Sequence, residues 1–267
     1  MLQYTFITSH RRDTMKKILL IFISVNKILL FLIFIFIISF TSNLIIHWQQ
    51  KNIPTTAKLN KKVIIDPGHG GVDSGAHHKE ILEKNINLAI AKKLATHLKE
   101  SNIEVKLTRT QDKLYKNDRQ QDLKHRIQVA NNSQAHILIS LHVNSFPSSQ
   151  SFGGETYYNN NCKEGKKLAS AIQEQLLKIQ PKNYRTIKTA PYYILQESKI
   201  PAVLIEVGFI SNSQDRKRIT NPQEQEKIAA AITTGIINYF NNNLHLLPSE
   251  EETFAIKKVA RWRLLMV

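Results

Sequence analysis

Cysteine is nearly absent from this 267-residue chain, which contains Cys162 and no other. A single cysteine excludes an intramolecular disulfide and any metal site built from several thiolates, so a bound metal ion would need histidine and carboxylate ligands. Cys162 follows three asparagines in a polar segment and has no motif of a cysteine nucleophile around it. The sequence therefore disfavours cysteine-based catalysis.

Acidic residues are also scarce, with 21 Asp and Glu against 37 Lys and Arg and a formal net charge of +16. From Lys61 onward 30 basic residues face 20 acidic ones, which leaves +10. Such a surface favours an acidic partner, and nucleic acid, anionic lipid and an anionic cell-wall polymer all qualify. Which of these three partners is available depends on the cellular compartment of the protein.

One long segment lacks charge altogether. Residues 28–48, ILLFLIFIFIISFTSNLIIHW, contain no Asp, Glu, Lys or Arg, and a helix of about 20 such residues crosses a membrane. No small-residue cleavage pattern follows, which favours an uncleaved anchor over a cleaved signal peptide. Five basic residues precede it: Arg11, Arg12, Lys16, Lys17 and Lys27. By the positive-inside rule, residues 1–27 are cytoplasmic and the rest is extracytoplasmic, which argues against nucleic acid as the partner.

The chain after this anchor divides into three parts. Polar residues 49–60 predict a linker, and residues 61–242 predict the folded domain. Residues 243–267 mix acids, bases and large apolar side chains and form a C-terminal tail of unknown role. Met15, just before Lys16 and Lys17, is an alternative start of the chain.

Apolar runs alternate with helical patterns through residues 61–242. Helical spacing predicts helices over 83–100, 123–131, 165–179 and 224–240. Short apolar or β-branched runs predict strands over 62–65, 103–108, 135–141, 156–158, 192–195 and 202–207. This alternation predicts an α/β fold with a mostly parallel sheet of about six strands and helices on both faces.

Two histidines stand where predicted strands end. His69 lies in the turn Asp66–Gly71 (DPGHGG), whose proline and glycines can present a side chain at the mouth of the sheet. His142 follows the strand 135–141 directly. Ligand sites of open α/β sheets lie at the carboxyl ends of strands, so these imidazoles can converge on one metal ion. An exposed or merely hydrogen-bonded histidine is the alternative for each, and His136, at the opposite end of its strand, is a poor candidate.

An acid at the start of the helix 83–100 is the third candidate ligand. Glu83 opens the apolar periodicity, so its side chain can point along the face that packs on the sheet, whereas Glu80 lies in the preceding loop. Its alternative role is to complement the helix dipole. Two neutral histidines and one carboxylate, with a fourth position for water, form a catalytic zinc set.

Glu206 is embedded in the apolar run 201–209, PAVLIEVGF. Burying a carboxylate there is costly unless a charge or hydrogen bond compensates it. A structural ion pair would do so, and so would a metal site. Burial would also raise the pKa of this carboxyl toward that of a general base, and we therefore expect Glu206 to be catalytic.

These motifs together resemble the zinc-dependent N-acetylmuramoyl-L-alanine amidases of the Amidase_3 type. Four segments occur in the family's order: Asp66–Gly71, Glu83–Asn85, Ser140–Asn144 and Ile205–Asn212. Over residues 61–242 the resemblance implies a catalytic domain with a twisted sheet flanked by helices. It implies that His69, Glu83 and His142 bind Zn²⁺ and that Glu206 is the catalytic acid/base. The reaction would cleave the amide bond between N-acetylmuramic acid and L-alanine in peptidoglycan by zinc-activated water.

The resemblance also suggests Arg109 and Asn144 as substrate-binding residues. One anchor followed by a bare catalytic domain is similar to the plan of spore-cortex amidases of endospore-forming bacteria, which implies a role in cortex maturation and an activator protein as partner. Two other functions stay open from the residues alone. One is a zinc carboxypeptidase-like wall peptidase, and the other a non-catalytic, wall-binding membrane protein.

Overall fold

The computed structural model describes residues 33–36, 38–41 and 60–244 of a chain that divides into two units, 1–57 and 58–267. In the first unit, residues 33–36 and 38–41 are helical with exposed side chains. No helix of the described ranges is both long and apolar enough to cross a membrane. Most of the predicted anchor 28–48 lies outside those ranges, together with residues 1–27, nearly all of the linker and residues 245–267. These assignments therefore stay predictions.

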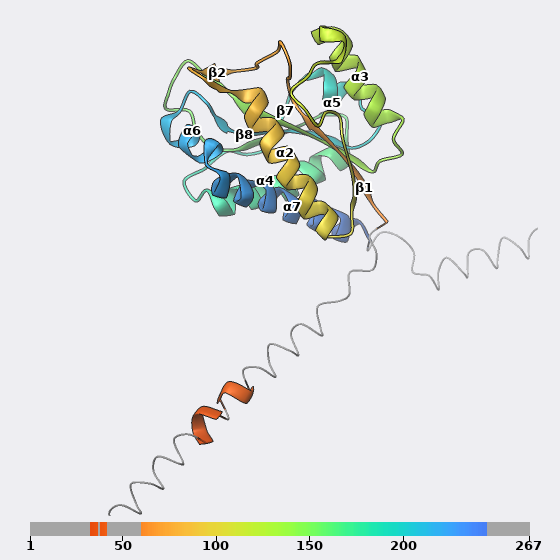
Figure 1. Cartoon of the computed structure of the whole chain (residues 1–267). Coiled ribbons are helices and arrows are strands. Elements are labelled where there is room, and N and C mark those ends of the chain that lie inside the picture. Colours follow the sequence, from red (N-terminus) through yellow and green to blue (C-terminus); the bar gives the residue numbers. More distant parts are fainter. Residues whose placement is uncertain (1–32, 37, 42–59, 245–267) are drawn as a thin grey trace, which may run out of the picture. The chain divides into compact units, whose positions relative to one another are not determined.

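A six-stranded sheet forms the centre of the second unit (Figure 1), in the order β4-β1-β5-β8-β6-β7. Neighbouring strands are parallel except for β6 and β8, which are antiparallel. The predicted α/β fold with a sheet of six strands is thus confirmed, and the sheet is mixed. Its strands are β1 (Lys62–Pro67), β4 (Glu104–Leu107), β5 (Ile137–Asn144), β6 (Glu155–Tyr158), β7 (Lys188–Thr189) and β8 (Ala202–Phe209).

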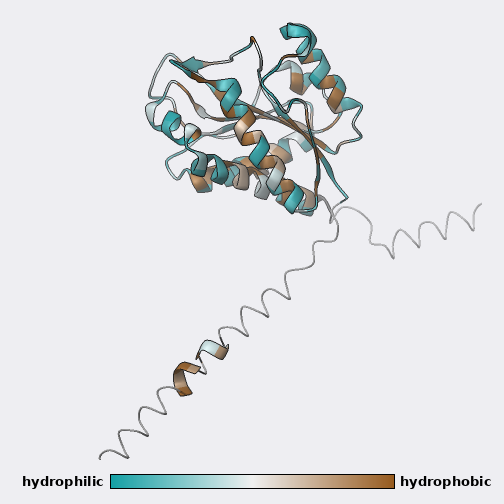
Figure 2. Ribbon diagram, in the orientation of Figure 1, coloured by the Kyte–Doolittle hydropathy of each residue, from teal (hydrophilic) through white to brown (hydrophobic). Residues whose placement is uncertain are grey.

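Helices cover both faces of the sheet. On one face α2 (Glu83–Glu100), α4 (Lys163–Ile179) and α7 (Pro222–Leu244) pack on alternate residues of β1, β5 and β8. On the other face α3 (Arg119–Asn131) and α5 (Tyr193–Gln196) pack on the residues in between, such as Ile64, Leu138 and Leu204. The central strands are therefore apolar on both sides, as the brown strands of Figure 2 show, and read as continuous apolar runs.

The helices follow from local sequence signals. In α2, Ile86, Ile90, Leu94 and Leu98 recur at every fourth residue and are all buried, and burying each such side chain contributes about 1.5–3 kcal/mol. The helix α3 begins four residues earlier than predicted because Asp118 caps it, accepting a hydrogen bond from the Gln121 N–H. Shorter elements complete the domain: β2 (His77–His78), β3 (Ile81–Leu82), the 3₁₀ helix η1 (Tyr115–Asn117) and α6 (Ser213–Thr220).

The strand predicted over 192–195 is wrong. This segment forms the one-turn helix α5, which still buries Ile194 and Leu195 against the sheet. A four-residue apolar run fits a buried strand and a buried helical turn equally well, so its pattern could not decide between them. The sixth strand is instead β7, whose two residues are polar and exposed and carry no strand signal.

Candidate active site

The turn after β1 presents His69 with an unusual backbone. His69 has a φ of 61°, followed by Gly70 at 146° and Gly71 at 54°. A left-handed conformation is uncommon for a residue with a side chain and has to be stabilised by its surroundings. The two glycines adopt their angles without a Cβ penalty, and the chain can therefore reverse sharply behind the histidine.

Two buried guanidinium groups hold this turn through its carbonyl oxygens. Arg109 donates from Nε to Pro67 O at 2.9 Å and from Nη2 to Gly68 O at 3.0 Å. Arg126 donates to Pro67 O at 2.7 Å and to His69 O at 2.8 Å. Three consecutive carbonyls are thus satisfied by arginine, which fixes the direction in which the turn presents its histidine.

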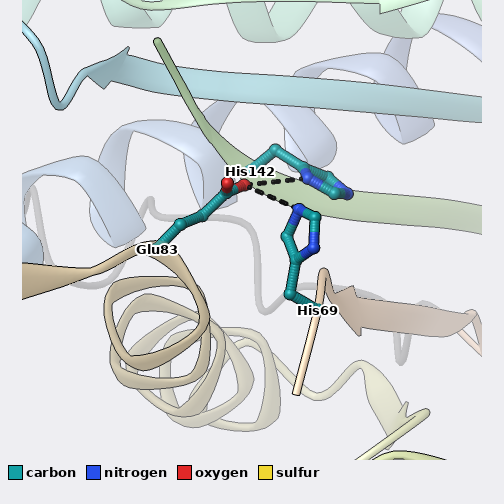
Figure 3. A group of neighbouring side chains, drawn as sticks. All are labelled: His69, Glu83 and His142. Atoms are coloured by element: carbon teal, nitrogen blue, oxygen red, sulfur yellow. Dashed lines mark hydrogen bonds and ion pairs between the residues drawn. The ribbon is translucent and has the colours of Figure 1, made fainter. Parts of the chain in front are cut away.

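The structure brings His69, Glu83 and His142 together (Figure 3), with one potential ligand atom of each lying within 4.8 Å of the others. Glu83 stands at the start of α2 and His142 on β5. Glu83 Oε1 lies 3.2 Å from His69 Nε2 and 3.0 Å from His142 Nδ1. These are three of the four residues that the sequence predicted for the catalytic centre, and together they form a possible metal site.

Further contacts fix the Glu83 carboxylate. The backbone N–H groups of Ala76 and Val143 donate to it at 2.7 and 3.0 Å, and Asn87 Nδ2 donates at 3.3 Å. Burial alone would raise the pKa of Glu83, but its hydrogen bonds with the two histidines hold that pKa well below the usual range. Glu83 is therefore an ionised carboxylate whose orientation is fixed by its contacts, which suits a candidate metal ligand.

Asp73 orients the first histidine from behind. Its Oδ2 lies 2.8 Å from His69 Nδ1. When Nδ1 carries the proton and donates to this carboxylate, Nε2 keeps its lone pair, and it is Nε2 that faces Glu83. Burial would lower the pKa of His69, but the hydrogen bonds with Glu83 and Asp73 raise it above its ordinary value. A carboxylate behind an imidazole is the usual second contact of a metal-binding histidine.

Glycine is required where the backbone passes close to the ligands. A Cβ on Gly68 would lie 2.3 Å from His142 Cε1. A Cβ on Gly75 would lie 2.5 Å from Glu83 Oε2, and the φ of 64° at Gly75 disfavours a side chain as well. Both backbone segments can therefore pack against ligand side chains without displacing them.

Glu206 lies beside this group on β8. It is the register partner of His142 in the parallel pair with β5 and of Glu155 in the antiparallel pair with β6. Its Oε2 is buried and has no hydrogen-bond partner among the residues that the structure describes. Burial, together with the charges of Glu83 and Glu155, raises the pKa of Glu206 well above its ordinary value. A carboxyl of this kind suits proton transfer near neutral pH.

A cavity of about 430 Å³ opens on the two histidines. His69 and His142 contribute to its lining, and the side chains around it come largely from α3 and from the first residues of α5 with the residue before them. They include Leu123, Tyr192, Tyr193 and Ile194, together with the charged residue Arg119. The cavity therefore combines a possible metal site with apolar side chains and with charged groups of both signs, among them Asp66, Asp73, Asp122 and Arg126.

The two residues predicted to bind substrate lie elsewhere. Arg109 is 5% exposed and spends its donors on main-chain carbonyls. The side-chain oxygen of Asn144 accepts from the Ser145 N–H at 2.7 Å. Neither is among the residues that line the cavity. A role for these two residues in substrate binding stays a prediction. The contacts of Arg109 show that it stabilises the turn that carries His69.

Comparison with known proteins identifies the family to which the chain belongs. The model of the Amidase_3 family, described as N-acetylmuramoyl-L-alanine amidase, matches residues 63–238. The chain belongs to the Amidase_3 family. This amidase is 33% identical over 218 residues to the germination-specific N-acetylmuramoyl-L-alanine amidase of Bacillus subtilis, with 78% of this chain and 90% of that relative covered. It is also 36% identical over 184 residues to N-acetylmuramoyl-L-alanine amidase LytC of the same organism, covering 68% of this chain and 36% of LytC.

A solved structure has the same fold as this amidase. It is the CwlD amidase from Clostridioides difficile in complex with the GerS lipoprotein. The sequence identity is 39% and the TM-score 0.66, with 68% of this chain and 99% of that one covered. The family resemblance expected from the four motifs is therefore confirmed.

Sequence reasoning missed several residues of this centre. Asp73 follows His69 by four residues, just after the motif Asp66–Gly71, and this spacing is a signal that could identify it. Tyr192 and Tyr193 line the cavity, whereas the sequence pattern of residues 192–195 predicts a strand. Glu155 faces Glu206 only through strand pairing, and no local pattern reveals such a pair.

Proposed function

We propose that this chain is a zinc-dependent peptidoglycan hydrolase that cleaves the amide bond between N-acetylmuramic acid and the L-alanine of the stem peptide. The observation that carries the proposal is the convergence of His69, Glu83 and His142, of which the two histidines line a cavity, with buried Glu206 as the strand neighbour of His142. Membership of a family of N-acetylmuramoyl-L-alanine amidases supports the choice of bond.

The donor set fits zinc. Two imidazoles and one carboxylate form the protein part of many catalytic zinc sites and leave a position for water. Glu83 is held ionised, and His69 has the carboxylate of Asp73 behind it. When bound there, zinc would acidify a water molecule and polarise the scissile carbonyl. His69, Glu83 and His142 would hold the ion.

Glu206 would carry the proton during the reaction. As the carboxylate it accepts a proton from the attacking water, and as the acid it donates that proton to the nitrogen of L-alanine. The second transfer is needed because an amide nitrogen leaves poorly unless it is protonated. The raised pKa of Glu206 suits both transfers, since a carboxyl with an ordinary pKa would hold the proton too weakly to return it.

Product analysis tests this function. The full chain, loaded with zinc, is incubated with purified peptidoglycan, and the soluble products are separated by mass. We expect free stem peptides with an N-terminal alanine. Shortened stems whose lactyl amide is intact would instead support a carboxypeptidase-like wall peptidase. Binding to the wall without any product would support a non-catalytic wall-binding protein.

We also propose that residues 28–48 anchor the protein in the cell membrane with its catalytic domain outside the cytoplasm. The uncharged apolar run and the basic residues before it support this topology. Deletion of residues 28–48 should move the protein from the membrane to the soluble fraction. Equal membrane retention of the truncated and the full chain would argue against the anchor.

A role in the spore cortex, with an activator as partner, completes the proposal. It is supported by the likeness to a germination-specific amidase and to the CwlD amidase that was solved with the GerS lipoprotein. Spores of a strain that lacks the gene should contain cortex without the products of amide cleavage. Unchanged cortex in such spores would point to a role in vegetative cells.

A further inference from the structure

We propose that Arg119 determines substrate specificity by binding the carboxylate of the stem-peptide residue that follows L-alanine. The inference deepens the proposed function and rests on it. In a stem peptide the second residue is a glutamate joined through its side chain, so its α-carboxylate is free unless it has been amidated. A cation near the scissile bond would distinguish these two forms.

Arg119 is placed where such a group would lie. It is the first residue of α3 and lines the same cavity as His69 and His142. Its Nη2 lies 3.0 Å from Asp73 Oδ1, and Asp73 Oδ2 lies 2.8 Å from His69 Nδ1. Two short contacts therefore separate the guanidinium from a candidate metal ligand. An extended peptide advances only about 3.5 Å per residue, so the residue after L-alanine lies within about 7 Å of the scissile bond.

The guanidinium has donors to spare. The Arg119 side chain is 70% exposed, and the ion pair with Asp73 is its only polar contact within residues 60–244. A guanidinium carries five N–H donors, and its planar fork can bind a carboxylate through two parallel hydrogen bonds. Arg119 can therefore accept a second carboxylate while keeping Asp73.

The other charged groups of the cavity lining are held in ion pairs. The carboxylates Asp66 and Asp122 share Arg126, which is 3% exposed, and Asp73 pairs with Arg119 itself. The remaining lining near Arg119 is mostly apolar, with Leu123 and Tyr193. The start of α3 adds the positive end of a helix dipole. An incoming anion would therefore meet one accessible cation, and that cation is Arg119.

A pair of substrates that differ in one group tests this inference. N-acetylmuramoyl-L-alanyl-γ-D-glutamyl-L-lysine carries the free α-carboxylate on its glutamate, and the corresponding D-isoglutamine peptide carries a neutral carboxamide there, while the amide to lysine closes the γ-carboxyl in both. Both are given to the full chain, to Arg119→Gln and to Lys124→Gln, which removes an exposed positive charge from the same helix outside the cavity lining. Release of the peptide gives KM and kcat for each combination of enzyme and substrate, and the zinc content of each enzyme is measured alongside.

We expect the wild type to have the lower KM for the carboxylate substrate. Arg119→Gln should raise that KM about 10-fold and leave the KM for the carboxamide, kcat and zinc content unchanged. Lys124→Gln should resemble the wild type. The role of Arg119 would be overturned if the wild type had equal KM values for both substrates, or if Arg119→Gln changed both KM values equally. Neither result would contradict the proposed function. Failure of the wild type to cleave either substrate would overturn the proposed function as well.

Discussion

His142 of β5 and Glu206 of β8 are register partners on adjacent parallel strands. The pairing sets a candidate metal ligand beside a buried carboxyl that has no hydrogen-bond partner at Oε2 in the described part of the chain. Two side chains that are 64 positions apart in the sequence thus owe their proximity to a single ladder of backbone hydrogen bonds. The roles proposed for these two residues, metal binding for His142 and proton transfer for Glu206, depend on this pairing.

The Glu206→Gln variant tests these roles. An amide keeps the shape of the carboxyl but cannot accept the proton, so kcat should fall by about 10²–10⁴-fold. Zinc content should be unchanged, because Glu206 is not among the three grouped ligands. Wild-type kcat in this variant would show that another group carries the proton, and loss of zinc would show that Glu206 is a ligand.

Removal of the metal should abolish activity. After treatment with a chelator the protein should release no stem peptide, and added zinc should restore the reaction. His69→Ala and His142→Ala should each leave the purified protein with less than one zinc per chain, because each change removes one of three ligands. His77→Ala is the matched control, since His77 is exposed on β2. Full activity of the chelated enzyme would contradict the zinc mechanism.

Asp73→Ala should weaken zinc binding without emptying the site. The change removes the partner of His69 Nδ1, and such partners typically contribute 10–100-fold in metal affinity or activity. A competition titration with a fluorescent chelator measures the zinc Kd directly. Asp112→Ala provides the control, because Asp112 contacts the same turn through the Gly71 N–H and touches neither histidine. Equal zinc Kd values for the two variants would argue against an orienting role for Asp73.

Asp66 should make stability depend on pH in the acidic range. Burial would raise its pKa, but the charge of Arg126 and hydrogen bonds from Thr108 and Ser140 bring that pKa below its ordinary value. A lowered folded pKa stabilises the protein above about pH 4, the pKa of an unfolded aspartate, and this stabilisation is lost as pH falls through the folded pKa.

The Asp66→Asn variant measures this effect. At pH 7 it should lose at most about 3–5 kcal/mol in free energy of unfolding, because it removes one of the two carboxylates that pair with the buried Arg126 and leaves only Asp122. The free energies of unfolding of the variant and the wild type are measured in urea at pH 7 and near pH 3. The difference between the two proteins should be smaller near pH 3 than at pH 7. Glu174→Gln, which breaks an exposed ion pair with Lys178, should change stability by less than about 1 kcal/mol. A difference for Asp66→Asn that is independent of pH would contradict this assignment.

The sequence predicted those parts of the site whose signals are local. His142 follows an apolar run directly, and His69 lies in the glycine-rich turn after another run. A strand followed by such a turn places a side chain at the end of a sheet regardless of the rest of the chain. Glu83 was found from the phase of one helix. The fold class followed from the alternation of strands and helices for the same reason.

The features of the site that could not be predicted from the sequence depend on contacts between distant segments. Arg109 and Arg126 are ordinary polar residues in their local context, and their contacts with the turn at residues 67–69 exist only once β1, β4 and α3 are assembled. The antiparallel placement of β6 likewise has no local signal, and it is this placement that sets Glu155 opposite Glu206.

The hold of Arg109 and Arg126 on the turn has an evolutionary consequence. Both guanidiniums bind main-chain oxygens of residues 67–69, so the path of the backbone does not depend on the imidazole that it displays. Exchange of that imidazole for a carboxylate or a thiolate would deliver a different donor atom to the same region of space. A single substitution at this position could thus change the metal preference of the proposed site, while the turn and its contacts with Arg109 and Arg126 stay the same.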